Sequence, residues 1–228
     1  MWSRRQIPAA ALGVLVGVIA VGIAMAAPGA TVKRDKLPEA PAAQASVQPV
    51  VRDTRGNLQA VFDNEVNAKV RYLEAAKVAD REGYRYVALV FRACARAEQV
   101  HAGQHVQAIA WTGGEARALL KKLALGTTAE NLKVAVDLET YEATQLYPAL
   151  LAHARAEHMT AAVRSMNFAL AAEREHARLF TAALETLDQR PAPRAFHVCA
   201  LCGKTVEKLD FEKCPNCFTL ARKFIRVE

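Results

Sequence analysis

The sequence predicts an all-α four-helix bundle followed by a small domain built around four cysteines. From about residue 52 to residue 190, apolar side chains recur at helical spacing with almost no strand signal. Two Cys-x-x-Cys pairs then follow within residues 195–228. The chain has 228 residues, 52% of them hydrophobic, which is enough for one core of moderate size and a small appendage.

The helical region divides at turn and capping residues. Gly83 stops the first helix, and Gly113-Gly114 ends the second. Thr127 and Glu130 have the spacing of a capping box at the start of the third helix. The predicted helices cover residues 56–82, 84–111, 127 onward and 159–189, the last stopped by Pro191.

The connections between these helices differ in length. Tight turns join the first helix to the second and the third to the fourth, which makes each pair antiparallel. Residues 112–127 form a longer connection between the two hairpins. One long crossover between two helical hairpins is the connectivity of ferritin-like bundles.

An apolar segment opens the chain. Arg4 and Arg5 precede an uncharged apolar run to about residue 27, long enough to span a bilayer, and its terminal position argues against a buried core helix. The run also fits a signal peptide with a cleavage site at Ala24-Met25-Ala26, although Pro28 disfavours cleavage directly before it. The start weakly resembles a twin-arginine export signal. Residues 1–27 are thus predicted to be a signal peptide or membrane anchor, which places the protein at the cytoplasmic membrane or in the periplasm.

The next segment and the charge distribution narrow the possible partners. Residues 28–51 are rich in Pro and Ala with few large apolar side chains, which predicts an extended linker. The formal net charge of +7 is concentrated towards the N-terminus. No basic helix interleaved with aromatic residues occurs, so we expect membrane targeting and no nucleic-acid binding.

Two copies of a Glu-x-x-His motif lie in the second and fourth predicted helices. Residues three apart share a helix face, so Glu98 and His101 can point into the bundle together. The same holds for Glu173 and His176. Each motif follows a glutamate of the preceding helix. Glu98 lies 33 residues after Glu65, and Glu173 lies 34 residues after Glu139, a similarity that indicates an internal repeat. The six residues are Glu65, Glu98, His101, Glu139, Glu173 and His176.

Such a set predicts a site for two metal ions. Carboxylate oxygens and imidazole nitrogens suit iron or manganese. One Glu from each of two helices, plus a Glu-x-x-His from each of the other two, is the ferritin-like di-iron arrangement. Buried unpaired carboxylates would be very costly without metal. Glu142, three residues after Glu139, adds a seventh candidate on the same face, and we expect two iron ions in the bundle.

The remaining histidines and the isolated cysteine carry weaker signals. His105 lies one turn after His101 and is expected to face solvent. His153 and His158 lie near the turn before the fourth helix and are expected at the surface. Cys94 is expected to be a small core residue.

Four cysteines near the C-terminus predict a second metal site. Two tight pairs with a short spacer indicate a metal site and not a disulfide framework. Too few apolar residues surround them for an independent core, so the metal must hold the fold. Zinc and iron both accept four thiolates, and spacing does not separate them. The cysteines are Cys199, Cys202, Cys214 and Cys217.

The bundle carries further motifs around its ligands. They are Asn64-Glu65 with Ala68 and Tyr72, Glu82-Gly83-Tyr84, Phe91-Arg92 leading to Ala97-Glu98-Gln99-Val100-His101-Ala102, Thr128-Ala129-Glu130-Asn131-Leu132, Glu139-Thr140-Tyr141-Glu142, Tyr147-Pro148, and Glu173 with His176. With these motifs, residues 57–187 resemble the di-iron domain of rubrerythrin.

The resemblance implies roles for several residues. Glu142 would be the extra carboxylate of this family, with one iron moving between His101 and Glu142 as the redox state changes. Tyr72 and Tyr147 resemble tyrosines that lie just outside the iron ligands, and their alternative role is core packing. The C-terminal domain would be rubredoxin-like, with an iron that relays electrons to the di-iron site. Its short spacer and few aromatic residues depart from a free-standing rubredoxin. A head-to-tail homodimer is also implied.

These expectations combine into an enzyme function. The chain is predicted to be an oxidoreductase, a non-haem di-iron peroxidase that reduces hydrogen peroxide to water with electrons from an unidentified donor protein or reductase. The alternative is a ferritin-like protein that oxidises and sequesters iron and carries a structural zinc ribbon. A third hypothesis is a membrane-linked regulatory protein with such a ribbon. Iron in the four-cysteine site favours the peroxidase, and zinc favours the other two.

Overall fold

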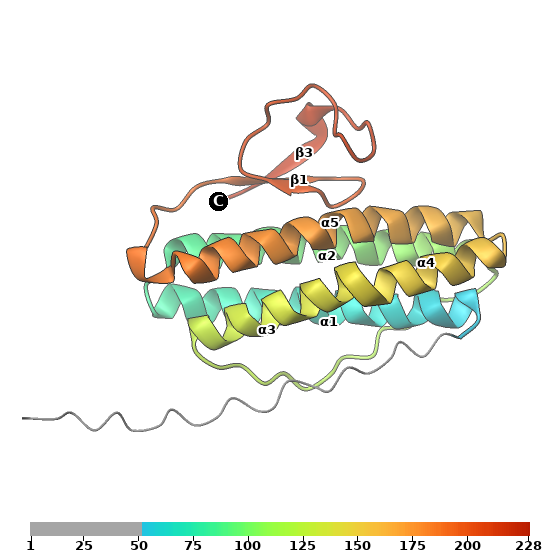
Figure 1. Cartoon of the computed structure of the whole chain (residues 1–228), viewed down its shortest axis with the longest axis horizontal. Coiled ribbons are helices and arrows are strands. Elements are labelled where there is room, and N and C mark those ends of the chain that lie inside the picture. Colours follow the sequence, from blue (N-terminus) through green and yellow to red (C-terminus); the bar gives the residue numbers. More distant parts are fainter. Residues whose placement is uncertain (1–51) are drawn as a thin grey trace, which may run out of the picture. The chain divides into compact units, whose positions relative to one another are not determined.

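The computed structural model describes residues 52–228 (Figure 1). The predicted N-terminal segment, residues 1–27, and the predicted linker, residues 28–51, lie outside the described residues. The described residues belong to one compact unit. Within them, none of the helices combines the length and the apolar character that crossing a membrane requires.

Four helical rods lie side by side and form the predicted four-helix bundle (Figure 1). The rods are α1 (Thr54–Arg81), α2 (Arg85–Trp111), α5 (Thr160–Glu185), and a composite of α3 (Thr128–Tyr141), a π-helical turn (Glu142–Leu146) and α4 (Tyr147–Ala156). A short 3₁₀ turn, Leu187–Gln189, follows α5. The rod α1 packs on α2, and α5 packs on both α2 and the composite rod.

The helix boundaries follow from the capping residues. Thr127 and Glu130 form the predicted capping box at the start of α3. Gly83 has a φ of +82° in the tight turn between α1 and α2, a conformation that favours glycine. The long crossover is tied to α1 by Asn67, whose side chain donates to Leu119 O and accepts from Lys121 N. These contacts confirm the ferritin-like connectivity of the bundle.

The composite rod contains a π-helical turn that the sequence did not indicate. Pro148 has no backbone N–H, and its ring would clash with the carbonyl four residues earlier in a regular α-helix. The wider turn at Glu142–Leu146 relieves this conflict and places the Tyr147 N–H on the Glu142 carbonyl. Glu142 and Tyr147 therefore stack one π turn apart, although an α-helix would separate them by about 140°.

The apolar core consists of two clusters, with the predicted ligands between them. One cluster includes Tyr72, Phe91 and Phe180, and the other includes Leu58 and Met166. On every rod, the predicted ligands fall between the residues of one cluster and those of the other. The two clusters thus hold the polar layer from both sides, and burial of their side chains provides most of the bundle's stability.

A three-stranded antiparallel sheet forms the C-terminal domain. Its strands are β1 (Phe196–Cys199), β2 (Thr205–Val206) and β3 (Phe224–Val227), in the order β2-β1-β3. Phe196 and Val198 of β1 are fully buried and belong to the apolar cluster around Phe91. Tyr86 of α2 donates a hydrogen bond to Glu207, 3.0 Å away. The bundle therefore supports this small domain in addition to any metal.

Candidate metal centres

The six predicted ligands meet in the polar layer of the bundle, and each is at most 1% exposed. Every rod contributes. They are Glu65 of α1, Glu98 and His101 of α2, Glu139 of α3, and Glu173 and His176 of α5.

The two histidines face the same pair of carboxylates. His101 Nδ1 lies 2.9 Å from Glu98 and 3.1 Å from Glu173. His176 Nδ1 lies 2.9 Å from Glu173 and 3.1 Å from Glu98. Glu98 and Glu173 thus stand between the histidines in a nearly twofold arrangement, which is the position of bridging ligands.

Each histidine has a further carboxylate of its own. Glu65 lies 3.8 Å from His101 Nδ1, and Glu139 lies 3.6 Å from His176 Nδ1. The ligand atoms form two overlapping groups, each within 4.8 Å. The groups are Glu65, Glu98, His101 and Glu173, and Glu98, Glu139, Glu173 and His176. Because Glu98 and Glu173 belong to both groups, the geometry defines two adjacent metal positions.

The polar layer contains more acceptors than its donors can satisfy. Three buried carboxylate atoms make no hydrogen bond: Glu98 Oε1, Glu139 Oε2 and Glu173 Oε1. Burial and the neighbouring Glu173 raise the pKa of Glu139 to about 8. Unpaired acceptors of this kind are expensive to bury, and cations would satisfy them. The residues therefore fit two iron ions, with carboxylate oxygens and both Nδ1 atoms as the donors.

Glu142 lies beside this cluster and is partly exposed. It belongs to neither ligand group, and Asn64 Nδ2 donates to its Oε1 over 3.4 Å. Burial and, next in size, the charge of Glu65 raise the pKa of Glu142 well above its ordinary value. Glu142 thus neighbours the metal position of Glu65 and His101, and its exchange with His101 stays a prediction.

The two predicted tyrosines hydrogen-bond to carboxylates at opposite ends of the site. Tyr72 donates to Glu139 Oε1, and Tyr147 donates to Glu65 Oε1. Burial and the neighbouring carboxylates raise the pKa of both phenols, which keeps them protonated as donors. Both also pack in the apolar clusters, so each combines packing with a hydrogen bond to a ligand.

The expectation that His105 faces solvent is wrong. His105 is fully buried and hydrogen-bonds Tyr147 and Ser165. Its spacing of four residues from His101 could have indicated this, because residues i and i+4 share a helix face. Cys94 is buried in the core as expected, His158 is exposed and His153 is partly exposed.

The four cysteines converge in the C-terminal domain. Their ligand atoms lie within 4.8 Å of one another, and all four thiols are free. Cys199 Sγ is 3.5 Å from Cys217 Sγ, and Cys202 Sγ is 3.6 Å from Cys214 Sγ. The hydrogen bond from Cys202 lowers the pKa of Cys199 to about 5. The arrangement fits one tetrahedral iron or zinc ion.

The turn after Cys202 rests against the di-iron ligands of the same chain. Gly203 has a φ of +75°, and a Cβ there would overlap the imidazole of His101 at Nε2. His101 Nε2 points away from the carboxylates and makes no hydrogen bond. Cys202 and His101 are thus separated by little more than the glycine backbone. The turn of the four-cysteine site therefore contacts a ligand of the di-iron site.

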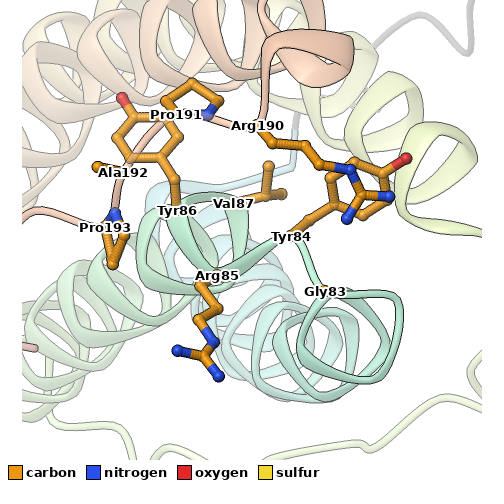
Figure 2. Close-up of a pocket in the computed structure, with 9 residues that line it drawn as sticks. All are labelled: Gly83, Tyr84, Arg85, Tyr86, Val87, Arg190, Pro191, Ala192 and Pro193. Carbon is orange, nitrogen blue, oxygen red and sulfur yellow. The ribbon is translucent and has the colours of Figure 1, made fainter. Parts of the chain in front are cut away.

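A small pocket lies apart from these centres, where the chain leaves the bundle for the C-terminal domain (Figure 2). It has a volume of about 170 Å³ and is lined by residues 83–87 and 190–193. The Arg190 guanidinium lies 4.4 Å from the centre of the Tyr84 ring. Figure 2 shows the two side chains next to each other. None of the predicted ligands lines the pocket. Its residues surround the connection between the bundle and the C-terminal domain.

The fold and the ligand set define a ferritin-like di-iron carboxylate protein with an added four-cysteine site. The rubrerythrin family model matches residues 56–184 of the chain. The chain belongs to the rubrerythrin family, as the resemblance predicted.

Individual relatives extend this match beyond the bundle. Nigerythrin of Nitratidesulfovibrio vulgaris is 33% identical over 175 residues, which cover 76% of this chain and 86% of the relative. Rubrerythrin-2 of Clostridium acetobutylicum is 29% identical over 171 residues, covering 73% and 92% of the two chains.

Solved structures of related proteins are also similar to this chain. The fully reduced, all-ferrous state of nigerythrin superposes with a TM-score of 0.73 at 33% identity, covering 80% of this chain and 90% of that one. Mycobacterium tuberculosis bacterioferritin superposes with a TM-score of 0.55 at 22% identity, covering 62% and 89%, which is a likeness of fold alone.

The geometry predicts different metal contents for two glutamate variants. Glu98→Ala should lose most of its iron, because Glu98 stands between both metal positions. Glu142→Ala should keep close to two irons per bundle, because Glu142 lies outside both ligand groups. Elemental analysis of folded proteins, prepared side by side and checked by circular dichroism, gives the comparison. Equal iron content in the two variants would contradict the assignment of Glu98 as a bridge.

The contact between Gly203 and His101 generates a second prediction. Gly203→Ala should strain a left-handed backbone and push the turn off His101, at a cost of about 1–3 kcal/mol. Gly113→Ala is the matched control, since Gly113 also has a positive φ, +74°, and a Cβ there would make only an ordinary contact of 3.9 Å with Arg55. Thermal unfolding and protease cleavage of residues 190–195 report the effect. If Gly203→Ala resists both as well as the control does, the close approach is not a feature of the folded protein.

Proposed function

We propose that this protein is a non-haem peroxidase that reduces hydrogen peroxide to water, with electrons entering through the four-cysteine site. The observation that carries the proposal is the turn at Cys202 and Gly203, which reaches His101 of the di-iron site. A di-iron site that is oxidised in every turnover must be reduced again, and a second redox site in contact with one of its ligands could supply these electrons. The donor that feeds the four-cysteine site would be a separate protein or reductase.

The residues around the polar layer suit this reaction. When bound, the two irons supply two electrons to the O–O bond, and these with two protons convert hydrogen peroxide into two waters. Tyr72 and Tyr147 each hold a proton at a carboxylate of one metal position. The two apolar clusters exclude bulk water from the site.

Iron storage is less well supported. A ferritin-like protein that oxidises and sequesters iron needs no path for returning electrons. The four cysteines could then be a structural zinc ribbon anywhere on the surface, with no reason to touch His101. The likeness to bacterioferritin concerns the fold alone.

The route between the two centres can lie within one chain. The head-to-tail homodimer implied by the family resemblance remains a proposal, in which the four-cysteine site of one subunit would serve the di-iron site of the other. The contact between Gly203 and His101 is made within a single chain and is what the intramolecular route requires.

A pair of defective chains distinguishes the two routes. Cys199→Ser should lose steady-state peroxide turnover with an external reductase, while a single turnover of its pre-reduced di-iron site survives. Glu98→Ala should lose turnover because it lacks the iron pair. Mixing and refolding the two variants together should restore no activity if each chain serves itself. Recovery approaching a quarter of wild-type turnover in a 1:1 mixture would instead establish transfer between subunits, because half of the chains pair in mixed dimers and each such dimer has one working site. Undiminished turnover of Cys199→Ser alone would remove the relay role.

The glutamate variants also bear on the peroxidase proposal. If Glu142 is a redox-dependent ligand, Glu142→Ala should keep its iron yet reduce peroxide more slowly, or shift its reactivity towards oxygen. Full iron content with a full peroxide rate would make Glu142 only a neighbouring glutamate.

We also propose that residues 1–27 export or anchor the protein, so that its folded part lies outside the cytoplasm. The arginines and apolar run at the start of the chain support this. A C-terminal fusion to a reporter active only outside the cytoplasm should be active, and deletion of residues 1–27 should abolish that activity. A bright cytoplasmic reporter in the same position, with the outer reporter silent, would contradict export.

A further inference from the structure

A buried hydrogen-bond chain leads from the core to one iron ligand. Ser165 Oγ of α5 lies 2.5 Å from His105 Nδ1 of α2. His105 Nε2 lies 3.0 Å from the phenol oxygen of Tyr147, the first residue of α4. Tyr147 in turn donates to Glu65 of α1. The chain thus connects all four rods of the bundle.

The direction of these hydrogen bonds follows from the acceptor at the end. An ionised carboxylate has no hydrogen to donate, so Glu65 only accepts from Tyr147. Tyr147 has a single proton, and it points to Glu65. His105 Nε2 must therefore carry a hydrogen and donate it to the phenol oxygen. This holds whether the imidazole is neutral or protonated.

Ser165 completes the placement of the ring. In the neutral imidazole, Nδ1 is the acceptor and the Ser165 hydroxyl donates to it. The rings of His105 and Tyr147 lie nearly parallel, with an interplanar angle of 21°, which aligns Nε2 with the phenol oxygen. The distance from His105 Nε2 to Glu65 Oε1 is 3.6 Å, too long for a direct hydrogen bond. His105 thus acts on Glu65 through Tyr147.

Among residues 52–228, no histidine or serine supports the tyrosine at the opposite end of the site. Tyr72 donates to Glu139, but its ring is packed between Phe91 and Phe180, at 5.9 and 5.0 Å between centroids. The two metal positions are alike in their ligands and differ in what holds their tyrosines.

We infer that His105, fixed by Ser165, is a positioning residue that locks the Tyr147 phenol as a donor to Glu65 and makes the two metal positions inequivalent. A hydrogen bond to a coordinating carboxylate draws electron density from it and restrains its rotation. The locked position is the one next to Glu142, where a change of ligand is expected. His105 touches no reacting atom. Its effect on the peroxide rate rests on the proposed function, whereas its effect on the hydrogen-bond chain does not.

The first test observes the hydrogen bond itself. The full chain is loaded with zinc, which is diamagnetic, and its histidines are labelled with ¹⁵N for NMR. His105 should show a proton on Nε2 that is protected from exchange. Tyr147→Phe should shift this resonance, and the matched change Tyr72→Phe should leave it in place. A proton on Nδ1 with a bare Nε2, or a resonance indifferent to Tyr147→Phe, would overturn the inference.

The second test compares His105→Leu with His105→Gln in the iron-loaded protein. Both should keep two irons, because His105 is no ligand. His105→Leu should lose about tenfold in peroxide rate, the scale of losing an outer partner of a metal ligand. His105→Gln, whose amide can donate at the place of Nε2, should recover most of it.

The outcomes separate the inference from the proposed function. Two outcomes would contradict the positioning role, provided that both variants are folded and iron-loaded. One is an equal peroxide rate in His105→Leu and wild type, and the other is no recovery of the peroxide rate in His105→Gln. If the wild-type protein itself reduces no peroxide, the proposed function fails, and the NMR comparison alone decides the role of His105.

Discussion

The burial of four carboxylates and two histidines in one layer of the bundle is the constraint on which the rest of the structure depends. Glu65, Glu98, Glu139 and Glu173 share a water-excluded layer in which three of their oxygen atoms have no hydrogen-bond donor. Such a layer is unfavourable by itself, because desolvated carboxylates repel one another. The packing of the fold holds the carboxylates together, and two divalent ions bound between them would offset this repulsion.

The arrangement of the core provides this packing. One apolar cluster surrounds Phe91 and Phe180, the other surrounds Leu58 and Met166, and the polar layer lies between them. Because every rod contributes to both clusters, no rod can withdraw its ligand without exposing apolar surface. Tyr72 and Tyr147 connect the apolar clusters to the polar layer, since their rings pack in the clusters and their hydroxyls donate to carboxylates.

The C-terminal domain depends on the bundle in the same way. Its strand β1 buries Phe196 and Val198 in the bundle core, so the position of the four cysteines is set by apolar packing as well as by their metal. That packing brings Gly203 against His101. A glycine is required there for two independent reasons, a left-handed backbone and the absence of room for a Cβ. Storage of iron would need neither, and this is why the contact favours a redox role.

The sequence by itself determined the bundle, its single long crossover and the identity of both candidate ligand sets, because these depend on local periodicity. The Glu-x-x-His spacing fixes which side chains share a helix face, and the capping box at Thr127 marks a helix start. Only the tertiary structure shows which residues from different rods contact one another, because local spacing carries no information about these contacts. The π turn at Glu142 turns Tyr147 towards Glu65, and the packing of three other rods makes His105 a buried partner where a solvent-facing residue was expected. Gly203 and His101 are about a hundred positions apart in the chain, and the packing of Phe196 and Val198 on the bundle brings them together.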